Sequence, residues 1–253
     1  HGVFDLLHYG HHLHFVAAGE YKQRVIQLGE QPERVFLVGG LGIDNIKRLK
    51  LLERNTLEVD LGFKFDKRNL LITFHPVTLE KASAVKQMQE LLSALAKLED
   101  TQLIFTMPNA DTDGRSLIKM VEQFSSQYPN AHAFTSLGQL RYLSCLAQVD
   151  GVVGNSSSGL AEVPSFKKGT INIGDRQRGR LQATSVINCE ATQQNISDAI
   201  YTLYSPNFQM DLSQVCNPYG EGGASDEIVK IIKSVTLDCL IKKHFYDVGH
   251  LCE

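Results

Sequence analysis

The segment with the clearest chemical potential is a run of small and polar residues from Gly154 to Gly159, with the sequence GNSSSG. It lies between an apolar stretch that predicts a buried strand and a short stretch that predicts a helix. Small residues let the main chain approach a ligand closely, and hydroxyl and N–H groups at a helix start donate to phosphate oxygens. The run matches neither the Walker loop nor the GxGxxG fingerprint. A phosphate site and an ordinary capped turn therefore both remain open from this run alone.

Charged side chains after this run could extend such a site. Glu162 falls in the first turns of the expected helix, where an acid either complements the helix dipole or accepts hydrogen bonds from a ribose. Arg176 follows the next strand, so its guanidinium could reach the same edge of the sheet, and a solvated basic loop is the alternative. For Arg178 and Arg180 we prefer the solvated loop.

Two further polar residues follow predicted strands. His75 stands between a buried strand and Pro76, which biases it toward an extended conformation and aims its ring at the strand end. An isolated histidine is, however, more often an ordinary polar group. Asn109 ends the next strand and is either a turn residue or a donor to a ligand, whereas for Asp111 and Asp113 turn formation is preferred.

Histidines near the beginning of the chain raise the question of a metal site, because imidazole is a common metal ligand. They are His8, His11, His12 and His14. His12 and His14 flank Leu13 at the spacing of a strand, and no acidic residue or cysteine accompanies them in a fixed pattern. We therefore expect no metal site. A serine hydrolase is not expected either, because no GxSxG element occurs.

Short β-rich runs alternate with longer amphipathic segments, a pattern typical of an α/β fold with helices on both faces of a parallel sheet. The predicted strands are 69–74, 102–106, 131–134, 151–153 and 170–173, and the predicted helices are 78–98, 114–128, 138–148 and a short one around 160–166. Ligands of such doubly wound folds lie at the carboxyl ends of the strands. The polar residues named above fall at those ends.

The two ends of the chain have weaker patterns. A shorter strand, helix, strand, helix run is expected over 14–17, 21–28, 34–38 and 43–52. Residues 53–68 have mixed charge and little periodicity, so we interpret them as a linker. Residues 226–233 predict a helix with Ser225 as its N-cap, and 237–244 predict a second helix.

Composition excludes several classes of protein. The chain has 253 residues, with 25 Lys and Arg against 28 Asp and Glu, which indicates neither nucleic-acid binding nor an anionic membrane surface. No apolar run approaches the ~18 residues that span a bilayer. Five scattered cysteines without a CxxC pair suggest neither a disulfide framework nor a zinc site. The first residues lack a signal-peptide pattern, so we expect a soluble cytoplasmic protein.

Five motifs occur in a recognisable order: TFHPVT at 73–78, MPNAD at 107–111, GNSSSGLAEVPSF at 154–166, NIGDRQRGR at 172–180 and YGEGGAS at 219–225. Together they make the chain closely resemble the hydrolysing UDP-N-acetylglucosamine 2-epimerases of sialic acid and related nonulosonic acid biosynthesis. The resemblance runs from about residue 12 to about residue 248. It implies two Rossmann-like lobes of the glycosyltransferase-B type with a UDP-sugar between them, no cofactor, and a homo-oligomer that is a dimer or a tetramer.

The residues that the resemblance assigns to UDP-sugar binding are His75, Asn109, Leu137, Ser156, Ser157, Glu162 and Arg176. It implies that Ser156 and Ser157 bind the diphosphate and that Glu162 binds the ribose hydroxyls. The loop around Leu137 would frame uracil through its main chain, and the other three residues would lie on the diphosphate and sugar side. His75 is also the one residue to which the matching motifs assign a catalytic role.

The implied reaction converts UDP-N-acetylglucosamine and water to N-acetylmannosamine and UDP, through loss of the C2 proton and UDP to a glycal that is then hydrated. It needs a base near C2, an acid for the addition of water, and groups that hold the leaving diphosphate. His1–Asp5 resembles a shortened form of the family's early HGDxFD element, and His12–His14 resembles a part that belongs much later in the first lobe. No position matches that lobe's acidic residues, the family's main candidates for proton transfer.

We therefore expect residues 1–60 to be the remnant of an incomplete N-terminal lobe, residues 67–235 a C-terminal UDP-binding lobe, and residues 236–253 a C-terminal helix and tail. A UDP-2,4-diacetamido-trideoxyglucose of legionaminic-type acid synthesis is an alternative substrate. A UDP-binding lobe without catalysis and a glycosyltransferase of the same architecture are alternative functions. NIGDRQRGR together with HPVT favours the epimerase over the transferase.

Overall fold

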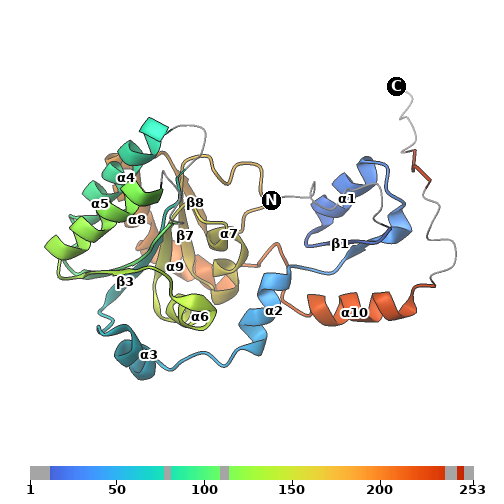
Figure 1. The fold of residues 1–253 in the computed structure, drawn as a ribbon, viewed down its shortest axis with the longest axis horizontal. Coiled ribbons are helices and arrows are strands. Elements are labelled where there is room, and N and C mark those ends of the chain that lie inside the picture. The colour runs from blue at the N-terminus through green and yellow to red at the C-terminus, as the bar shows by residue number, and fades with distance from the viewer. Residues whose placement is uncertain (1–11, 77–80, 109–113, 237–243, 248–253) are drawn as a thin grey trace. The chain divides into compact units, whose positions relative to one another are not determined.

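A computed structural model of the chain describes residues 12–76, 81–108, 114–236 and 244–247. Contacts divide the chain into two compact units (Figure 1), of which the first contains His1–Arg48 and Asn217–Glu253 and the second contains Leu49–Cys216. The division differs from the predicted boundaries, since the expected linker belongs to the second unit and the segment from Asn217 onward belongs to the first. Within the described parts of both units, no helix is long and apolar enough to cross a membrane.

The first unit is built on a two-stranded parallel sheet. Its elements are β1 (His14–Val16), α1 (Gly19–Gln27), the 3-10 helix η2 (Pro32–Arg34), β2 (Val35–Leu37), α2 (Leu41–Arg48) and α10 (Ala224–Ser234). Val16, Val25 and Val35 form its small core, one from each strand and one from α1. The predicted order of strand, helix, strand and helix is confirmed, although α2 ends at Arg48 rather than at residue 52.

The carboxylate of Asp44, on α2, caps the amino end of α10. Asp44 Oδ1 accepts hydrogen bonds from the N–H groups of Gly223 at 2.7 Å and Ala224 at 3.0 Å, and Oδ2 accepts from the N–H of Ser225 at 2.7 Å and from its hydroxyl. The prediction of Ser225 as N-cap is wrong: Gly223 holds that position with a φ of 96°. Ser225 instead lies in the first turn, because Asp44 already supplies the acceptors that a helix start needs.

The second unit contains a six-stranded parallel sheet in the order β5-β4-β3-β6-β7-β8. Its strands are β3 (Arg68–Thr73), β4 (Thr101–Thr106), β5 (Ala131–Phe134), β6 (Gly151–Gly154), β7 (Gly169–Ile173) and β8 (Val186–Cys189). The chain adds β4 and β5 on one side of β3 and then crosses to place β6 on the other side. The strand order therefore reverses between β3 and β6, which confirms the predicted doubly wound α/β fold.

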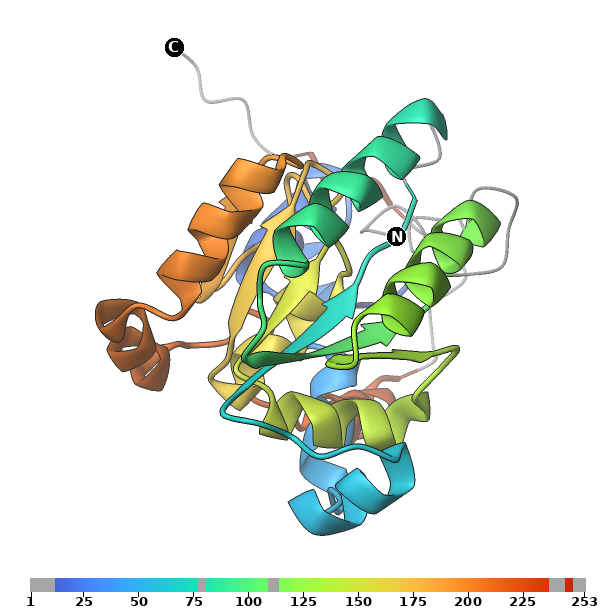
Figure 2. The same ribbon diagram turned by 90° about the vertical axis from the view of Figure 1, so that its left-hand side faces the viewer.

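Helices cover both faces of this sheet (Figure 2). The elements of the two layers are α4 (Lys81–Leu95), α5 (Gly114–Gln127) and α8 (Gln193–Leu203) on one face, and α6 (Gly138–Gln148), α7 (Ser158–Ala161) and the 3-10 helix η3 (Val163–Phe166) on the other. Leu70 and Ile72 of β3 share one core with Met88 of α4 and Leu117 of α5. A strand buried on both faces is the reason why β3 reads as a continuous apolar run.

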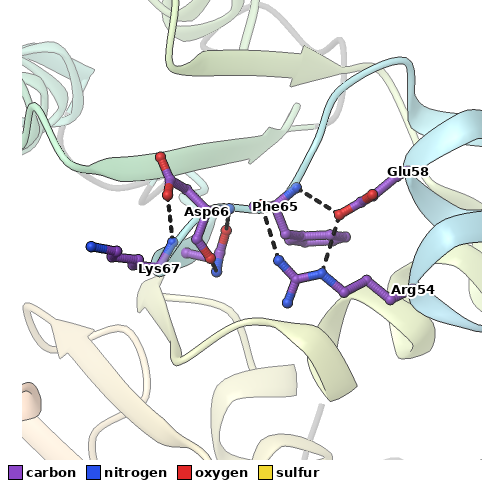
Figure 3. Close-up of polar contacts among 6 residues, drawn as sticks. Arg54, Glu58, Phe65, Asp66 and Lys67 are labelled. Atoms are coloured by element: carbon purple, nitrogen blue, oxygen red, sulfur yellow. Dashed lines mark hydrogen bonds and ion pairs between the residues drawn. The ribbon is translucent and has the colours of Figure 1, made fainter.

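The segment 53–68 is not a simple linker, because it contains helix α3 (Arg54–Leu61). Leu57 and Leu61 lie one turn apart and are buried, and Gly62 ends the helix with a φ of 75°. Glu58 Oε1 accepts from Arg54 Nε and from the N–H of Phe65, each at 3.1 Å, and Arg54 Nη2 donates to the Phe65 carbonyl at 3.0 Å (Figure 3). These bonds fix α3 to the segment that leads into β3.

Other differences from the predicted elements are local. The short helix expected around 160–166 is two elements, α7 and η3, since Pro164 has no N–H to continue a helix. Four elements were not predicted from the sequence: β8, α8, α9 (Pro206–Asp211) and the 3-10 helix η4 (Leu212–Gln214). The helix expected over 237–244 lies outside the described residues except for His244.

Candidate functional site

The carboxyl ends of β3 and β6 meet where the strand order reverses. Thr73 pairs with Gly154 at the last position of the register. Gly154 has a φ of 142°, and a Cβ on it would lie 2.0 Å from the Thr73 carbonyl oxygen, so only glycine permits this approach. At such a reversal the loops after the two strands leave in opposite directions and open a crevice for a ligand. Three of the predicted site residues lie in the first turns of these loops: His75, Ser156 and Ser157.

Asn155 joins the loops that follow β3, β6 and β7. The side chain is buried, its Oδ1 accepts from the N–H of His75 at 2.8 Å, and its Nδ2 donates to the carbonyl of His75 at 2.8 Å. Its own carbonyl accepts from Arg176 Nη1 at 2.9 Å and from Gln177 Nε2 at 2.7 Å. The structure thus brings His75 and Arg176 together through a residue that the sequence analysis did not single out. Its position between a buried strand and the serine run was the available signal.

The serine run leads directly from Asn155 into α7. Ser157 precedes the helix and is exposed, and Ser156 is partly exposed with its Oγ 3.4 Å from the N–H of Ser158. The Ser158 hydroxyl has a partner within the protein, because its Oγ accepts a 2.7 Å hydrogen bond from the hydroxyl of Tyr142 on α6. Ser156 and Ser157 therefore offer hydroxyl groups to a ligand, and Ser158 belongs to the supporting structure.

Glu162 follows α7 and is partly buried. Burial raises the pKa of its carboxyl, and the hydrogen bond from the Ser158 hydroxyl opposes this shift without cancelling it. The Oε2 atom is buried and has no hydrogen-bond partner among the residues that the structure describes. A buried acceptor without a donor is costly, so a ligand hydroxyl that donated to this carboxylate would relieve the cost.

Tyr142, like Asn155, is a supporting residue that was not predicted from the sequence. Burial raises its pKa to about 12, so its hydroxyl is a neutral donor at ordinary pH. The hydrogen bonds run from Tyr142 to Ser158 and from Ser158 to the Glu162 carboxylate. Helix α6 therefore contributes to the orientation of Glu162.

The other predicted site residues have different placements. Leu137 immediately precedes α6, its side chain is buried, and its carbonyl accepts from Arg141 Nε at 2.9 Å. For Leu137 itself, only the main chain is therefore available to a ligand. Asn109 lies outside the described residues, so its predicted role stays a prediction.

The amino-terminal histidines do not form a metal centre in the described part of the chain, where no group of three or more His, Cys, Asp or Glu side chains could hold an ion. His14 is buried on β1 and its Nε2 lies 2.8 Å from Glu30 Oε2. This acidic partner lies sixteen residues away in the sequence and was not apparent from the local pattern. His8 and His11 fall outside the described residues.

Residues 10–233 match the family model described as UDP-N-acetylglucosamine 2-epimerase. The chain belongs to this family. It is 39% identical over 239 residues to the GDP/UDP-N,N'-diacetylbacillosamine 2-epimerase (hydrolyzing) of Campylobacter jejuni, covering 94% of this chain and 62% of that protein. It is also 39% identical over 238 residues to the polysialic acid biosynthesis protein P7 of Escherichia coli, covering 93% of this chain and 60% of that protein.

A solved structure of S. aureus MnaA with UDP has a TM-score of 0.71 and 20% identity, covering 94% of this chain and 62% of that chain. This likeness confirms the fold that the sequence motifs implied. The chain spans about 60% of the length of the curated relatives that it matches.

Proposed function

We propose that the second unit binds the UDP part of a UDP-sugar at the carboxyl end of its sheet, and that the protein acts as a hydrolysing UDP-N-acetylglucosamine 2-epimerase. The main support for this proposal is the arrangement of side chains where the strand order reverses between β3 and β6. A carboxylate with an unfilled acceptor, Glu162, lies one turn beyond exposed serine hydroxyls, and Arg176 is tied to the residue that precedes those serines. Membership of the epimerase family supports the class of substrate.

Each side chain has a chemically reasonable task in this proposal. The carboxylate of Glu162 accepts hydrogen bonds from the ribose hydroxyls and gains the donor that Oε2 lacks. The hydroxyls of Ser156 and Ser157 donate to the diphosphate, and the Arg176 guanidinium offers it a permanent positive charge. These groups stabilise the charge that the departing UDP acquires, which is the most demanding electrostatic change of the reaction.

The proposed reaction has two steps. In the first, a base takes the C2 proton while the bond between C1 and the UDP oxygen breaks, which yields a glycal and UDP. In the second, water adds its hydroxyl to C1 and a proton returns to C2 on the opposite face, which yields N-acetylmannosamine. The motifs assign His75 to the sugar side of the site, where an imidazole can donate or accept a proton near neutral pH.

A second candidate substrate deserves a direct comparison because of one relative. The Campylobacter jejuni protein, 39% identical to this chain, is named for N,N'-diacetylbacillosamine rather than for N-acetylglucosamine. The two sugars differ in their substituents at C4 and C6, and the proposed uridine and diphosphate contacts are the same for both. The choice between them is therefore decided by turnover and not by UDP affinity.

The test begins with calorimetric titration of UDP, with CDP as the control nucleotide because it differs from UDP in the base alone. We expect saturable binding of UDP and much weaker binding of CDP, and equal binding of both would contradict a uridine site. Proton NMR in D2O then follows each UDP-sugar separately. Release of UDP together with N-acetylmannosamine deuterated at C2 would support the main proposal. Turnover of the diacetamido sugar alone would establish the alternative. UDP binding without turnover of either sugar would limit the function to nucleotide binding.

A further inference from the structure

We infer that Asn155 is a positioning residue of the UDP site, which fixes the main chain at His75 and the guanidinium of Arg176 relative to the serine loop. This inference rests on the proposed function. Asn155 is 1% exposed, so its side chain itself is not presented to a ligand. Its effect must therefore pass through the residues to which it is bonded.

The side chain of Asn155 holds the end of β3 by two opposite hydrogen bonds. Its amide oxygen accepts from the N–H of His75 and its amide nitrogen donates to the carbonyl of the same residue, both at 2.8 Å. The Asn155 N–H also donates to the Thr73 carbonyl at 3.2 Å, so the link between the two strands continues past the last paired position. An asparagine amide satisfies both partners because it carries one acceptor and one donor group at the same end.

The main chain of Asn155 holds the loop after β7. Arg176 Nη1 and Gln177 Nε2 both donate to its carbonyl oxygen, at 2.9 Å and 2.7 Å. Gln177 is buried, whereas Arg176 is exposed. A rotation of the Asn155 peptide would therefore move the guanidinium, the His75 main chain and the first serine hydroxyl together. Small displacements of this kind are costly in a site that relies on several convergent contacts.

The same strand provides a matched control at its other end. Asn69, in β3, is 2% exposed and makes the same pair of bonds with one main-chain partner: its amide oxygen accepts from the N–H of Asp66 and its amide nitrogen donates to the carbonyl of Asp66, both at 2.9 Å. It lies at the amino end of β3, away from the carboxyl ends of the strands. Asn69→Ala and Asn155→Ala therefore remove equivalent buried hydrogen bonds, and only the second removes them beside the proposed site.

The experiment measures UDP affinity by calorimetry and thermal unfolding of the full chain in four proteins: the wild type, Asn155→Ala, Asn155→Asp and Asn69→Ala. We expect both alanine variants to unfold at lower temperature, but only Asn155→Ala to weaken UDP binding, by about tenfold or more. Asn69→Ala should stay within about twofold of the wild type. Asn155→Asp keeps an acceptor for the His75 N–H but sets a second acceptor against the His75 carbonyl and adds a negative charge beside the proposed diphosphate site, so it should weaken UDP binding at least as much as Asn155→Ala.

The possible outcomes separate the inference from the proposed function. If the wild type binds UDP and the two alanine variants weaken it equally, the positioning role is wrong while the UDP site stands. An aspartate variant that binds UDP as tightly as the wild type would also overturn the role, because it lacks the donor to the His75 carbonyl. If the wild type does not bind UDP, the proposed function and the inference both fail.

A measurement on the wild type alone keeps the inference testable if Asn155→Ala does not fold. The amide of His75 donates to the buried Asn155 oxygen, so it should exchange its hydrogen with solvent slowly in the unliganded protein. Exchange as fast as that of an exposed loop amide would show that the bond does not persist in solution, and it would overturn the inference.

Discussion

Asp44 in the first unit and Glu162 in the second are both carboxylates withdrawn from solvent, and their surroundings are opposite. Asp44 accepts from three main-chain N–H groups and one hydroxyl at the start of α10. The hydroxyl of Ser225 has the largest effect and, with the N–H groups, outweighs burial and lowers its pKa to about 2. Burial raises the pKa of Glu162, and its Oε2 has no partner within the described ranges.

The contrast distinguishes a carboxylate that serves the fold from one that, in the proposed function, serves a ligand. Asp44 has its hydrogen-bonding capacity used by the protein, so it contributes to stability and has little left to offer. Glu162 retains an unused acceptor that costs free energy in the unliganded protein. A protein tolerates such a cost most readily where binding a ligand relieves it, which is why perturbed carboxylates concentrate at functional sites.

The largest expected effect is on the folding of the first unit. Asp44→Ala removes the acceptors of four donors at the start of α10, so we expect the free energy of unfolding to fall by roughly 3 kcal/mol in denaturant titrations. Asp226→Ala is the control, because it removes an exposed ion pair with Arg48 and an exposed acid in the first turn of α10, and together these should cost at most about 1 kcal/mol. Equal losses in the two variants would contradict the structural role of Asp44.

The next effect concerns UDP and not folding. Glu162→Ala should weaken UDP binding by roughly 1–3 kcal/mol, because hydrogen bonds to a charged, partly buried acceptor are lost. The unfolding free energy should stay the same or rise, because an acceptor without a donor is removed. Calorimetry measures the first quantity and denaturant titration the second. Glu190→Ala, on an exposed loop, is the control. Unchanged UDP affinity in Glu162→Ala would contradict a ligand role for Glu162.

Periodicity predicted the buried part of the fold well and its margins poorly. The bounds of β5 and α6 agree with the predicted ones, because apolar burial dictates both the elements and the pattern. The edge strand β8 escaped prediction because its residues are only partly buried and include the exposed Asn188. Helix α3 escaped because only Leu57 and Leu61 mark its buried face, and the rest of it is polar apart from the exposed Val59.

The sequence likewise indicated some residues of the candidate site and not others. Ser156, Glu162 and Arg176 were singled out because of their residue types and their places after strands, and the resemblance to the epimerases assigned them roles that stay predictions. Asn155 and Tyr142 were missed because their roles depend on distant partners. Asn155 meets His75 across eighty positions of sequence, and Tyr142 meets Ser158 across a strand. Local sequence patterns do not reveal contacts between residues so far apart in the chain.

The pH dependence of the two carboxylates should have opposite signs. The pKa of Asp44 is lowered from 3.8 to about 2, so its contribution to stability is present above 3.8 and is lost as the pH falls toward 2. The pKa of Glu162 is raised above 4.5, so its contribution to stability decreases as the pH rises through that raised value. Denaturant titrations of the wild type, Asp44→Asn and Glu162→Gln at a series of pH values measure how each carboxylate changes the free energy of unfolding with pH.

Binding of UDP provides a second test of the Glu162 shift. In the proposed function a ribose hydroxyl donates to the ionised carboxylate, so UDP affinity should fall as the pH is lowered through the raised pKa of Glu162 and the carboxylate takes up a proton. The phosphates of UDP titrate in the same range, and Glu162→Gln isolates that background. An identical pH profile in the wild type and in Glu162→Gln would contradict the assignment of Glu162 to the ribose.

The smallest effect comes from the hydroxyl that supports Glu162 from α6. Tyr142→Phe removes the 2.7 Å hydrogen bond to Ser158 and leaves the ring in place, so it should weaken UDP binding by about threefold, close to the value of one neutral hydrogen bond. Tyr204→Phe is the matched control: it removes a 3.3 Å hydrogen bond to Asp150, beside the amino end of β3, and should leave UDP affinity unchanged. Equal changes in UDP affinity would mean that the network through Ser158 does not orient the carboxylate, and that Glu162 reaches the ligand without support from α6.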